Sequence, residues 1–208
     1  MELLAFGHAG VPILAFPSSM GRYFEWEDFK MAEALSEQLE NGHNQLICVA
    51  SVDSESFYNK HVDPFVRIKR YQQSEAYIIN EVVPFIRKRS ENGFIIAAGA
   101  SFGAYHASNM VFKHPHLFGK LIALSGAYDI KSFMDGFYNN DVYFNNPIDY
   151  MSGLGDKDMI KAIDANSIVL TIGESDPCKE ANFSMSQILS AKGISHNLDM
   201  TPGFGHDW

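Results

Sequence analysis

The sequence predicts an α/β protein with a mostly parallel central sheet flanked by helices. Residues 94–98, 121–124 and 168–172 are apolar on both alternating sets of positions, which is typical of strands covered on both faces. Apolar residues at helical spacing follow at about 102–112 and 180–191. Strands and helices in this alternation favour a parallel sheet that carries helices on its faces.

The N-terminal part is expected to extend this sheet. Residues 3–6 and 11–16 are short apolar runs around a glycine-containing turn, which predicts a hairpin. Apolar residues at helical spacing predict one surface helix over 26–40, and Gly42 supplies a stop signal just after it. A buried strand is expected over 45–49.

A longer helix is predicted over 64–89, with a kink at Pro84 because proline has no N–H to donate within a helix. Residues 131–165 are rich in Asn, Asp and Tyr and are expected to form an irregular or short-helical excursion above the sheet. A last strand is expected over 195–200, and the whole chain, 1–208, fits one domain. The expected buried stripe of the long helix consists of Tyr71, Tyr77, Ile78, Val82, Phe85 and Ile86.

The composition is that of an ordinary globular protein, with 46% hydrophobic and 20% charged residues. The formal net charge of −9 repels phosphate backbones and anionic lipid, so neither nucleic acid nor a membrane surface is an expected partner. The two cysteines, Cys48 and Cys178, form no disulfide framework or zinc motif. The first residues lack the basic region of a signal peptide and no stretch reaches the ~20 apolar residues of a membrane span, so a cytoplasmic location is expected.

The sharpest local motif is Gly99-Ala100-Ser101-Phe102-Gly103, which follows the expected strand 94–98 and precedes a helix. A G-x-S-x-G in that context is typical of the nucleophile elbow of the α/β-hydrolase fold. Small residues two before and two after the serine let neighbouring segments approach closely. We therefore expect Ser101 to be a nucleophile, although the same motif also occurs as a plain turn.

A serine hydroxyl needs a base, and the base needs an acid that orients it. In this fold the chain order is Ser, then Asp or Glu, then His. His206 lies on a glycine-rich loop after the last expected strand, and Asp176 lies just beyond the strand 168–172. We expect these two residues to be base and acid. Glu174 and Asp129 remain alternatives for the acid, whereas the other histidines are expected to be surface or packing residues.

Two backbone N–H groups are expected to stabilise the oxyanion that forms during acyl transfer. The first belongs to Phe102, the residue after the nucleophile. The second is expected in the loop 17–21, with Ser19 favoured and Met20 as the alternative. Neither a zinc-protease spacing nor a phosphate-binding loop is present, so no metal and no cofactor are expected.

With these residues in place, the chain resembles the Putative esterase family, which includes esterase D (S-formylglutathione hydrolase) and the antigen 85 mycolyltransferases. It is most similar to the bacterial esterase-like branch. The resemblance implies Ser101 as nucleophile, Asp176 as acid, His206 as base, ester or thioester substrates and no cofactor. Family members usually extend further at both ends, with a last helix after the histidine. The segments that carry the resemblance are 16–23, 51–56, 99–104, 124–128, 143–147 and 205–208.

The leading hypothesis is a carboxylic-ester hydrolase that acts through an acyl-enzyme, and an acyltransferase of the same fold is the alternative. A non-catalytic binding protein is a third possibility, against which the retained Ser, Asp and His order argues. Trp208 is expected to pack against the body of the protein and hold the His206 loop. The aromatic residues that either line an acyl pocket or belong to the core are Phe133, Phe137, Tyr138, Tyr143 and Phe144.

Overall fold

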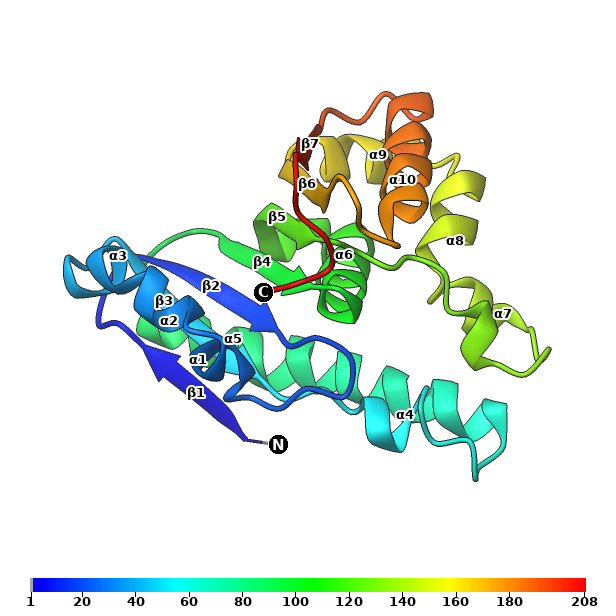
Figure 1. Ribbon diagram of the computed structural model, residues 1–208, viewed down its shortest axis with the longest axis horizontal. Coiled ribbons are helices and arrows are strands. Elements are labelled where there is room, and N and C mark those ends of the chain that lie inside the picture. The colour runs from blue at the N-terminus through cyan, green and yellow to red at the C-terminus, as the bar shows by residue number, and fades with distance from the viewer. Residues whose placement is uncertain (1) are drawn as a thin grey trace.

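The computed structural model of the protein describes residues 2–208. Within these residues the chain forms a seven-stranded sheet in the order β1-β3-β2-β4-β5-β6-β7 (Figure 1). β1 is antiparallel to β3, and each of the other neighbouring pairs is parallel. The strands are β1 (Leu3–Phe6), β2 (Val11–Phe16), β3 (Asn44–Val49), β4 (Ile95–Ala100), β5 (Phe118–Leu124), β6 (Ser167–Gly173) and β7 (Asn197–Thr201).

Helices connect most of the parallel strands. A single π-helical turn, Ile78–Val82, joins α4 to α5, and short 3₁₀ turns lie at Asp53–Glu55, Pro115–Leu117 and Lys131–Phe133. The α-helices are α1 (Glu25–Asp28), α2 (Met31–Ala34), α3 (Ser36–Glu40), α4 (Pro64–Tyr77), α5 (Val83–Arg89), α6 (Phe102–Lys113), α7 (Asn140–Tyr143), α8 (Pro147–Gly153), α9 (Lys157–Asp164) and α10 (Lys179–Ala191).

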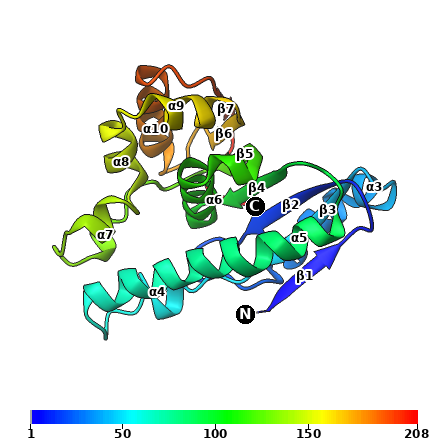
Figure 2. The same ribbon diagram turned by 180° about the vertical axis from the view of Figure 1, so that it is seen from behind.

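The sheet separates two apolar layers. On one face, α5, α6 and α8 to α10 pack on the larger core, whereas Ile68 and Tyr71 of α4 belong to a further apolar cluster with Phe102 of α6. Figure 2 shows α4 and α5 as one long rod beside α6. On the other face, α1 to α3 cover β2, β3 and β4 with a smaller core. Buried side chains of the larger core include Ile47, Ile86, Leu121 and Leu170, and those of the smaller core include Ile13, Trp26, Leu39 and Leu46.

The predicted fold class is confirmed, because the sheet is mostly parallel and helices flank it. The three runs that are apolar on both alternating sets of positions form β4, β5 and β6. β4 is the central strand of the sheet, and β5 and β6 follow it toward the β7 edge. The long helix is also confirmed from Pro64 to Arg89. Since Pro84 cannot donate a hydrogen bond to the preceding turn, the helix widens into the π-helical turn just before it.

The predicted hairpin is wrong. β1 and β2 do not pair with each other, because β3 lies between them and bonds to both. β3 is buried along nearly its whole length, so it is stabilised by a place inside the sheet rather than at its edge. The apolar patterns of the first two strands do not distinguish a hairpin from this arrangement. β2 is buried along most of its length, whereas β1, at the edge of the sheet, is only partly buried.

The single helix predicted over 26–40 is also wrong, because the segment forms α1, α2 and α3. Lys30 interrupts it in the left-handed region, with φ of 61°. Three short helices can follow a twisted sheet more closely than one straight helix, and Trp26 and Leu39 both reach the same core. Phe85 differs from expectation too: it is 37% exposed on the outer side of α5, whereas Ile86 is buried.

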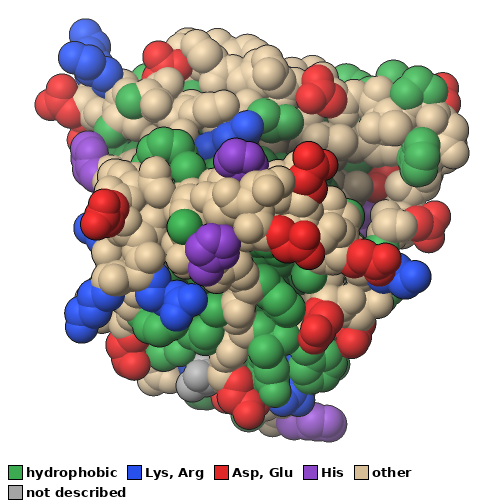
Figure 3. All heavy atoms as spheres, turned by 90° about the vertical axis from the view of Figure 1, so that its left-hand side faces the viewer, with side chains coloured by type: hydrophobic (Ala, Val, Ile, Leu, Met, Phe, Trp, Pro, Cys, Tyr) green, Lys and Arg blue, Asp and Glu red, His purple; other side chains and the backbone are tan. Residues whose placement is uncertain are grey.

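Residues 131–165 form α7, α8 and α9, as the short-helical prediction allowed. α8 packs on α6 and α10, so this excursion adds to the layer on the larger core. None of the helices in residues 2–208 is both long and apolar enough to cross a membrane. On the side where α3 lies, charged side chains of both signs are scattered around an area of hydrophobic side chains (Figure 3).

Candidate functional site

Ser101 lies at the sharp turn between β4 and α6, with φ of 56° and ψ of −117°. The left-handed φ is unfavourable for a residue with a side chain, and it is typical of a nucleophile elbow. The turn is held because the Ser101 N–H donates to the Leu124 carbonyl at 2.8 Å. A Cβ at Gly99 would fall on the backbone of Gly103, and one at Gly103 on the carbonyl of Pro17. The expected need for small residues on both sides is therefore a steric fact of this turn.

Ser101 begins a chain of hydrogen bonds that includes both other residues predicted for the site. Its Oγ lies 2.9 Å from Nε2 of His206. Nδ1 of His206 lies 2.9 Å and 3.0 Å from the two carboxylate oxygens of Asp176. Because a carboxylate can only accept, the ring proton belongs on Nδ1, and Nε2 is left as an acceptor for the serine hydroxyl.

Asp176 is buried and has further donors around it. The Cys178 N–H donates to it at 2.7 Å. Burial favours its neutral form, but hydrogen bonds from the Ser125 hydroxyl, the Cys178 N–H and His206 outweigh this effect, and the pKa of Asp176 is lowered from its usual value. The carboxyl group is thus held as an anion. Sequence reasoning missed Ser125, and the signal that could have found it is its position just after β5, at the same sheet edge.

The two alternative acids lie elsewhere. Asp129 accepts from the N–H of Lys131 and the amide of Asn146, within the excursion after β5. Glu174 accepts the N–H of Gly203 at 3.0 Å, so it ties the loop that carries His206 rather than His206 itself.

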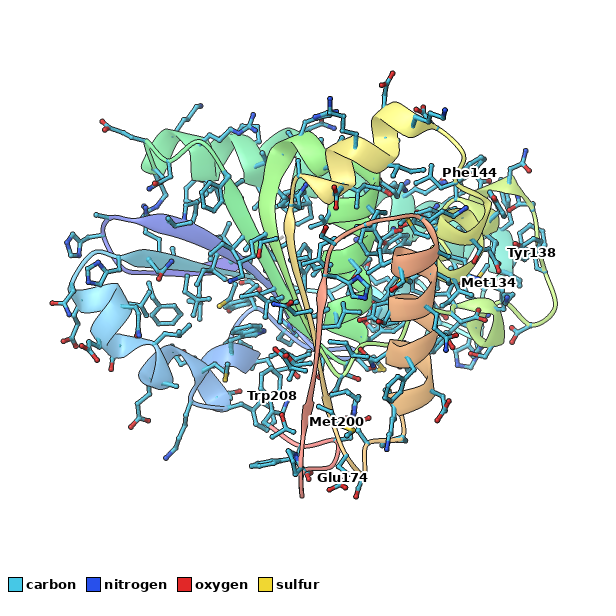
Figure 4. All side chains as sticks on the ribbon, turned by 90° about the horizontal axis from the view of Figure 1, so that it is seen from above. Met134, Tyr138, Phe144, Glu174, Met200 and Trp208 are labelled. Carbon is cyan, nitrogen blue, oxygen red and sulfur yellow. The ribbon has the colours of Figure 1, made fainter. Side chains whose placement is uncertain are left out.

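The loop between β7 and His206 is close to the end of β6. A Cβ at Gly173 would lie 2.6 Å from the carbonyl oxygens of Phe204 and Gly205, so the loop passes directly over this glycine. The Ser175 N–H donates to the Phe204 carbonyl at 3.0 Å. Figure 4 shows Glu174 on the same side of the molecule as Trp208.

Trp208 anchors the chain beyond His206. Its ring stacks on Phe29 at 4.9 Å with an interplanar angle of 9°, and it meets Trp26 edge-on at 5.9 Å. The side chain remains 42% exposed, because only its inner face is covered. The expected packing of Trp208 against the body of the protein is confirmed.

The loop after β2 lies opposite His206. In the part of the chain that the structure describes, neither the Ser19 N–H nor the Phe102 N–H donates to another group. The Met20 N–H, in contrast, donates to Asp53 at 3.0 Å. Of the two residues predicted from this loop, Ser19 is therefore the one with a free backbone donor, and Met20 has a different partner.

Ser19, Ser101 and His206 border a cleft of about 400 Å³. None of the five aromatic residues of the excursion is among the residues that line it. Tyr138 and Phe144 are 49% and 57% exposed, and Figure 4 shows them far from Trp208. The lining residues are Ser18, Ser19, Met31, Ala100, Ser101, Leu124, Ser125, His206, Asp207 and Trp208.

Among residues 2–208, one group of three potential metal ligands lies within 4.8 Å: Asp176, Cys178 and His206. Asp176 and His206 already bond to each other, so a metal ion on Nδ1 would replace the hydrogen bond that fixes the His206 tautomer.

Residues 26–197 match the family model described as Putative esterase. A search of curated proteins gives no significant match. The fold is similar to that of a ferulic acid esterase, with 19% identity and a TM-score of 0.72 over 96% of this chain and 79% of that one. S-formylglutathione hydrolases from Staphylococcus aureus (16% identity, TM-score 0.68, 97% and 76% covered) and Agrobacterium tumefaciens (13%, 0.71, 99% and 82%) are similar as well. Because the family model spans most of its length, this chain belongs to the Putative esterase family of α/β-hydrolases.

Proposed function

We propose that the protein is a carboxylic-ester hydrolase that acts through Ser101, His206, Asp176 and an acyl-enzyme. The observation that carries the proposal is the continuous hydrogen-bond chain from Ser101 Oγ through His206 to Asp176, with contacts of 2.9 Å on both sides of the ring. Membership of an esterase family supports the same reaction class.

In the first half-reaction, Ser101 Oγ attacks the carbonyl carbon of the ester while its proton passes to Nε2 of His206. Asp176 stabilises the imidazolium that forms, and its lowered pKa keeps it anionic for this purpose. When the tetrahedral intermediate collapses, His206 returns the proton to the departing alcohol. The acyl group remains as an ester on Ser101.

In the second half-reaction, water takes the place of the alcohol. His206 removes a proton from the water as its oxygen attacks the acyl carbon, and then gives that proton back to Ser101 Oγ. The carboxylic acid leaves and the free serine is restored. A thioester reacts by the same steps with a thiol as leaving group, so small esters and thioesters are both proposed as substrates.

The N–H groups of Ser19 and Phe102 are proposed to bind the oxyanion in both half-reactions. Both are free of other partners in the described chain, and Ser19 and Ser101 border the same cleft. Removal of one such donor typically costs about 10²- to 10³-fold in kcat.

Ser101→Ala tests the proposal. It should lower hydrolysis of p-nitrophenyl acetate by about 10³-fold or more, because the nucleophile is lost while the fold is kept. The wild type should be labelled rapidly by a fluorophosphonate and the variant should not, with unchanged circular dichroism as the control. Retention of more than about a tenth of the rate would contradict the assignment. Product partition in excess alcohol then distinguishes hydrolysis from acyl transfer.

A further inference from the structure

A second carboxylate–histidine pair lies behind the nucleophile and has no part in the proposed reaction. Asp53 Oδ1 lies 3.0 Å from Nε2 of His106. The Asp53 side chain is fully buried, and that of His106 is 7% exposed. Burial of a carboxylate is costly unless donors surround it, so the donors that face Asp53 identify what it holds in place.

The second oxygen of Asp53 reaches the loop after β2. Its Oδ2 accepts the N–H of Met20 at 3.0 Å. Met20 directly follows Ser19 and has a left-handed backbone, with φ of 59°. His106, on the other side of Asp53, belongs to α6, the helix that begins at Phe102. Asp53 therefore links the segment of one proposed oxyanion donor to the helix of the other.

We propose that Asp53 and His106 are positioning residues for the oxyanion hole. They fix the Ser19–Met20 peptide relative to α6, so that the N–H groups of Ser19 and Phe102 converge on one point. This inference rests on the proposed ester hydrolysis, since an oxyanion hole has no role without it.

Packing fixes the His106 side of this link, whereas the Met20 side depends on the hydrogen bond to Asp53. The His106 ring stacks on Tyr71 at 5.7 Å and meets Phe102 edge-on at 5.0 Å, so its orientation is fixed by packing. Met20, in contrast, is 51% exposed, and its side chain has little packing to hold it. The left-handed region is energetically unfavourable for a non-glycine residue. The hydrogen bond to Asp53 opposes a return of Met20 to ordinary backbone angles.

Other contacts hold the same loop, but within the described chain none of them bonds to the Ser19–Met20 peptide itself. The Tyr58 hydroxyl donates to Ser19 Oγ at 2.9 Å, and the Gly21 N–H donates to the Ser18 carbonyl at 3.0 Å. Ser51 donates to the Gly21 carbonyl from both its hydroxyl and its N–H. Glu25 accepts from the N–H and hydroxyl of Ser18. With these contacts kept, loss of the Asp53 bond would leave the loop in place but free the peptide next to the Ser19 donor to rotate.

Asp53→Asn is the direct test. Asparagine replaces two bonds to an anion by one to its oxygen and one from its NH2 group, and the second requires the His106 ring to adopt the other tautomer. Bonds to a neutral amide are weaker than bonds to a carboxylate, so the link between Met20 and His106 is loosened. We expect kcat to fall about 10- to 100-fold, with KM changed less than about threefold, because the oxyanion is bound in the transition state and not in the ground state. Affinity for a trifluoromethyl ketone, whose hemiketal adduct with Ser101 Oγ carries the oxyanion, should fall by a similar factor.

Glu75→Gln is the matched control. Glu75 is also a buried carboxylate bonded to a histidine, His114 at 2.8 Å, and to Lys113 at 2.6 Å, but it does not contact the loop after β2. This variant should keep kcat and ketone affinity within about twofold of the wild type, even if its stability falls as much as that of Asp53→Asn. A merely structural role of Asp53 would make the two variants behave alike.

His106→Phe keeps a ring in place but removes the donor to Asp53, and should lower kcat in the same direction. The double variant should lose no more than the worse single variant, since both act through one contact chain. If Asp53→Asn does not fold, His106→Phe and its ketone affinity decide the question. Normal kcat in a folded Asp53→Asn, an unchanged ketone affinity, or an equal loss in Glu75→Gln would overturn the inference. A wild type without esterase activity would overturn the proposed function as well.

Discussion

The three acidic residues considered for the site have different contacts, so each can be tested by its own substitution. Asp176 contacts the His206 ring, Glu174 contacts the loop that carries it, and Asp129 contacts neither. Asp176→Asn should therefore lower kcat by about 10⁴-fold, because an amide no longer fixes the tautomer that leaves Nε2 free. Glu174→Gln, whose oxygen can still accept from Gly203, should lose less than about tenfold.

Steady-state kinetics on the same ester decides between these acids, and Asp129→Asn is the control that should leave kcat nearly unchanged. A loss in Asp129→Asn larger than that in Asp176→Asn would show that the acid is wrongly assigned.

Asp176 also predicts a pH effect on stability. Its pKa is lower in the folded protein than in the unfolded chain, so its contribution to the free energy of unfolding is fully present above the usual aspartate pKa of about 3.9. That contribution is lost as the pH falls below this value through the lowered pKa. Urea denaturation at about pH 6 and about pH 3 should show a smaller acid loss for Asp176→Asn than for the wild type. Equal losses in both proteins would contradict the lowered pKa.

Sequence reasoning selected three residues from a local motif and from the chain order, and in the structure their side chains lie within hydrogen-bond distance of one another. Ser101 stands in a five-residue motif, and His206 and Asp176 follow in the order this fold uses. It missed the contacts of Ser125 and Asp53, since their partners are distant in the sequence: Asp53 contacts Met20 and His106 only once β2, β3 and α6 are packed. No local pattern encodes such contacts, because they depend on three elements at once.

At the level of the elements, the site depends on two loops that cross the carboxyl ends of the strands. The loop with His206 passes so close to the end of β6 that a methyl group at Gly173 would push against two carbonyl oxygens. Gly173→Ala should displace the loop and lower kcat about 10- to 100-fold, while core packing changes little. Gly155→Ala, where a Cβ meets nothing within 4 Å, is the control that should leave kcat unchanged. Equal kcat values for the two variants would show that the loop yields without moving His206.

Trp208 holds the other end of this loop. Trp208→Ala removes the stacking on Phe29 and the edge contact with Trp26, so the loop should lose order and kcat/KM should fall about tenfold. Because the ring is 42% exposed and outside the sheet, the free energy of unfolding should fall by less than about 1 kcal/mol. Urea denaturation and ester hydrolysis on the same preparation measure both effects. A large stability loss with normal activity would mean that Trp208 serves the core instead.

The breaks between elements were harder to predict than the elements. The apolar spacing over 26–40 is compatible with one helix, yet the backbone turns at Lys30 so that three short helices follow the sheet. The pairing of β3 between β1 and β2 was likewise not readable, since period-two and continuous apolar patterns mark burial and not the neighbouring strand.

Across the whole molecule, the sheet and its two layers were predictable because burial leaves a strong pattern. Strands β4, β5 and β6 are apolar on both sides, and helices cover all three on the face of the larger core. On the other face, alternate residues of β5 and β6 such as Ile122 and Val169 are only partly buried. The pattern fails where an apolar side chain packs against neighbours at the surface instead of in the core. Phe85 fits the expected stripe of its helix, but it is on the outer side of α5, with the Arg89 guanidinium 5.5 Å from its ring.

Phe85 and Ile86 are neighbours on α5, one at the surface and one in the core, and no residue of α5 lines the cleft. Ile86 is 1% exposed and belongs to the larger core, so Ile86→Ala should lower the free energy of unfolding by about 2–5 kcal/mol through lost burial and the cavity left behind. Phe85→Ala should cost less than about 1 kcal/mol, because its ring already lies 37% exposed and its removal leaves no enclosed cavity.

Both variants should keep the wild-type kcat at temperatures well below their unfolding transitions, since neither residue touches the Ser101 site. Urea denaturation curves of the three proteins measure the difference. Equal losses for the two variants would mean that Phe85 also packs into the core and that the buried face of α5 includes both residues.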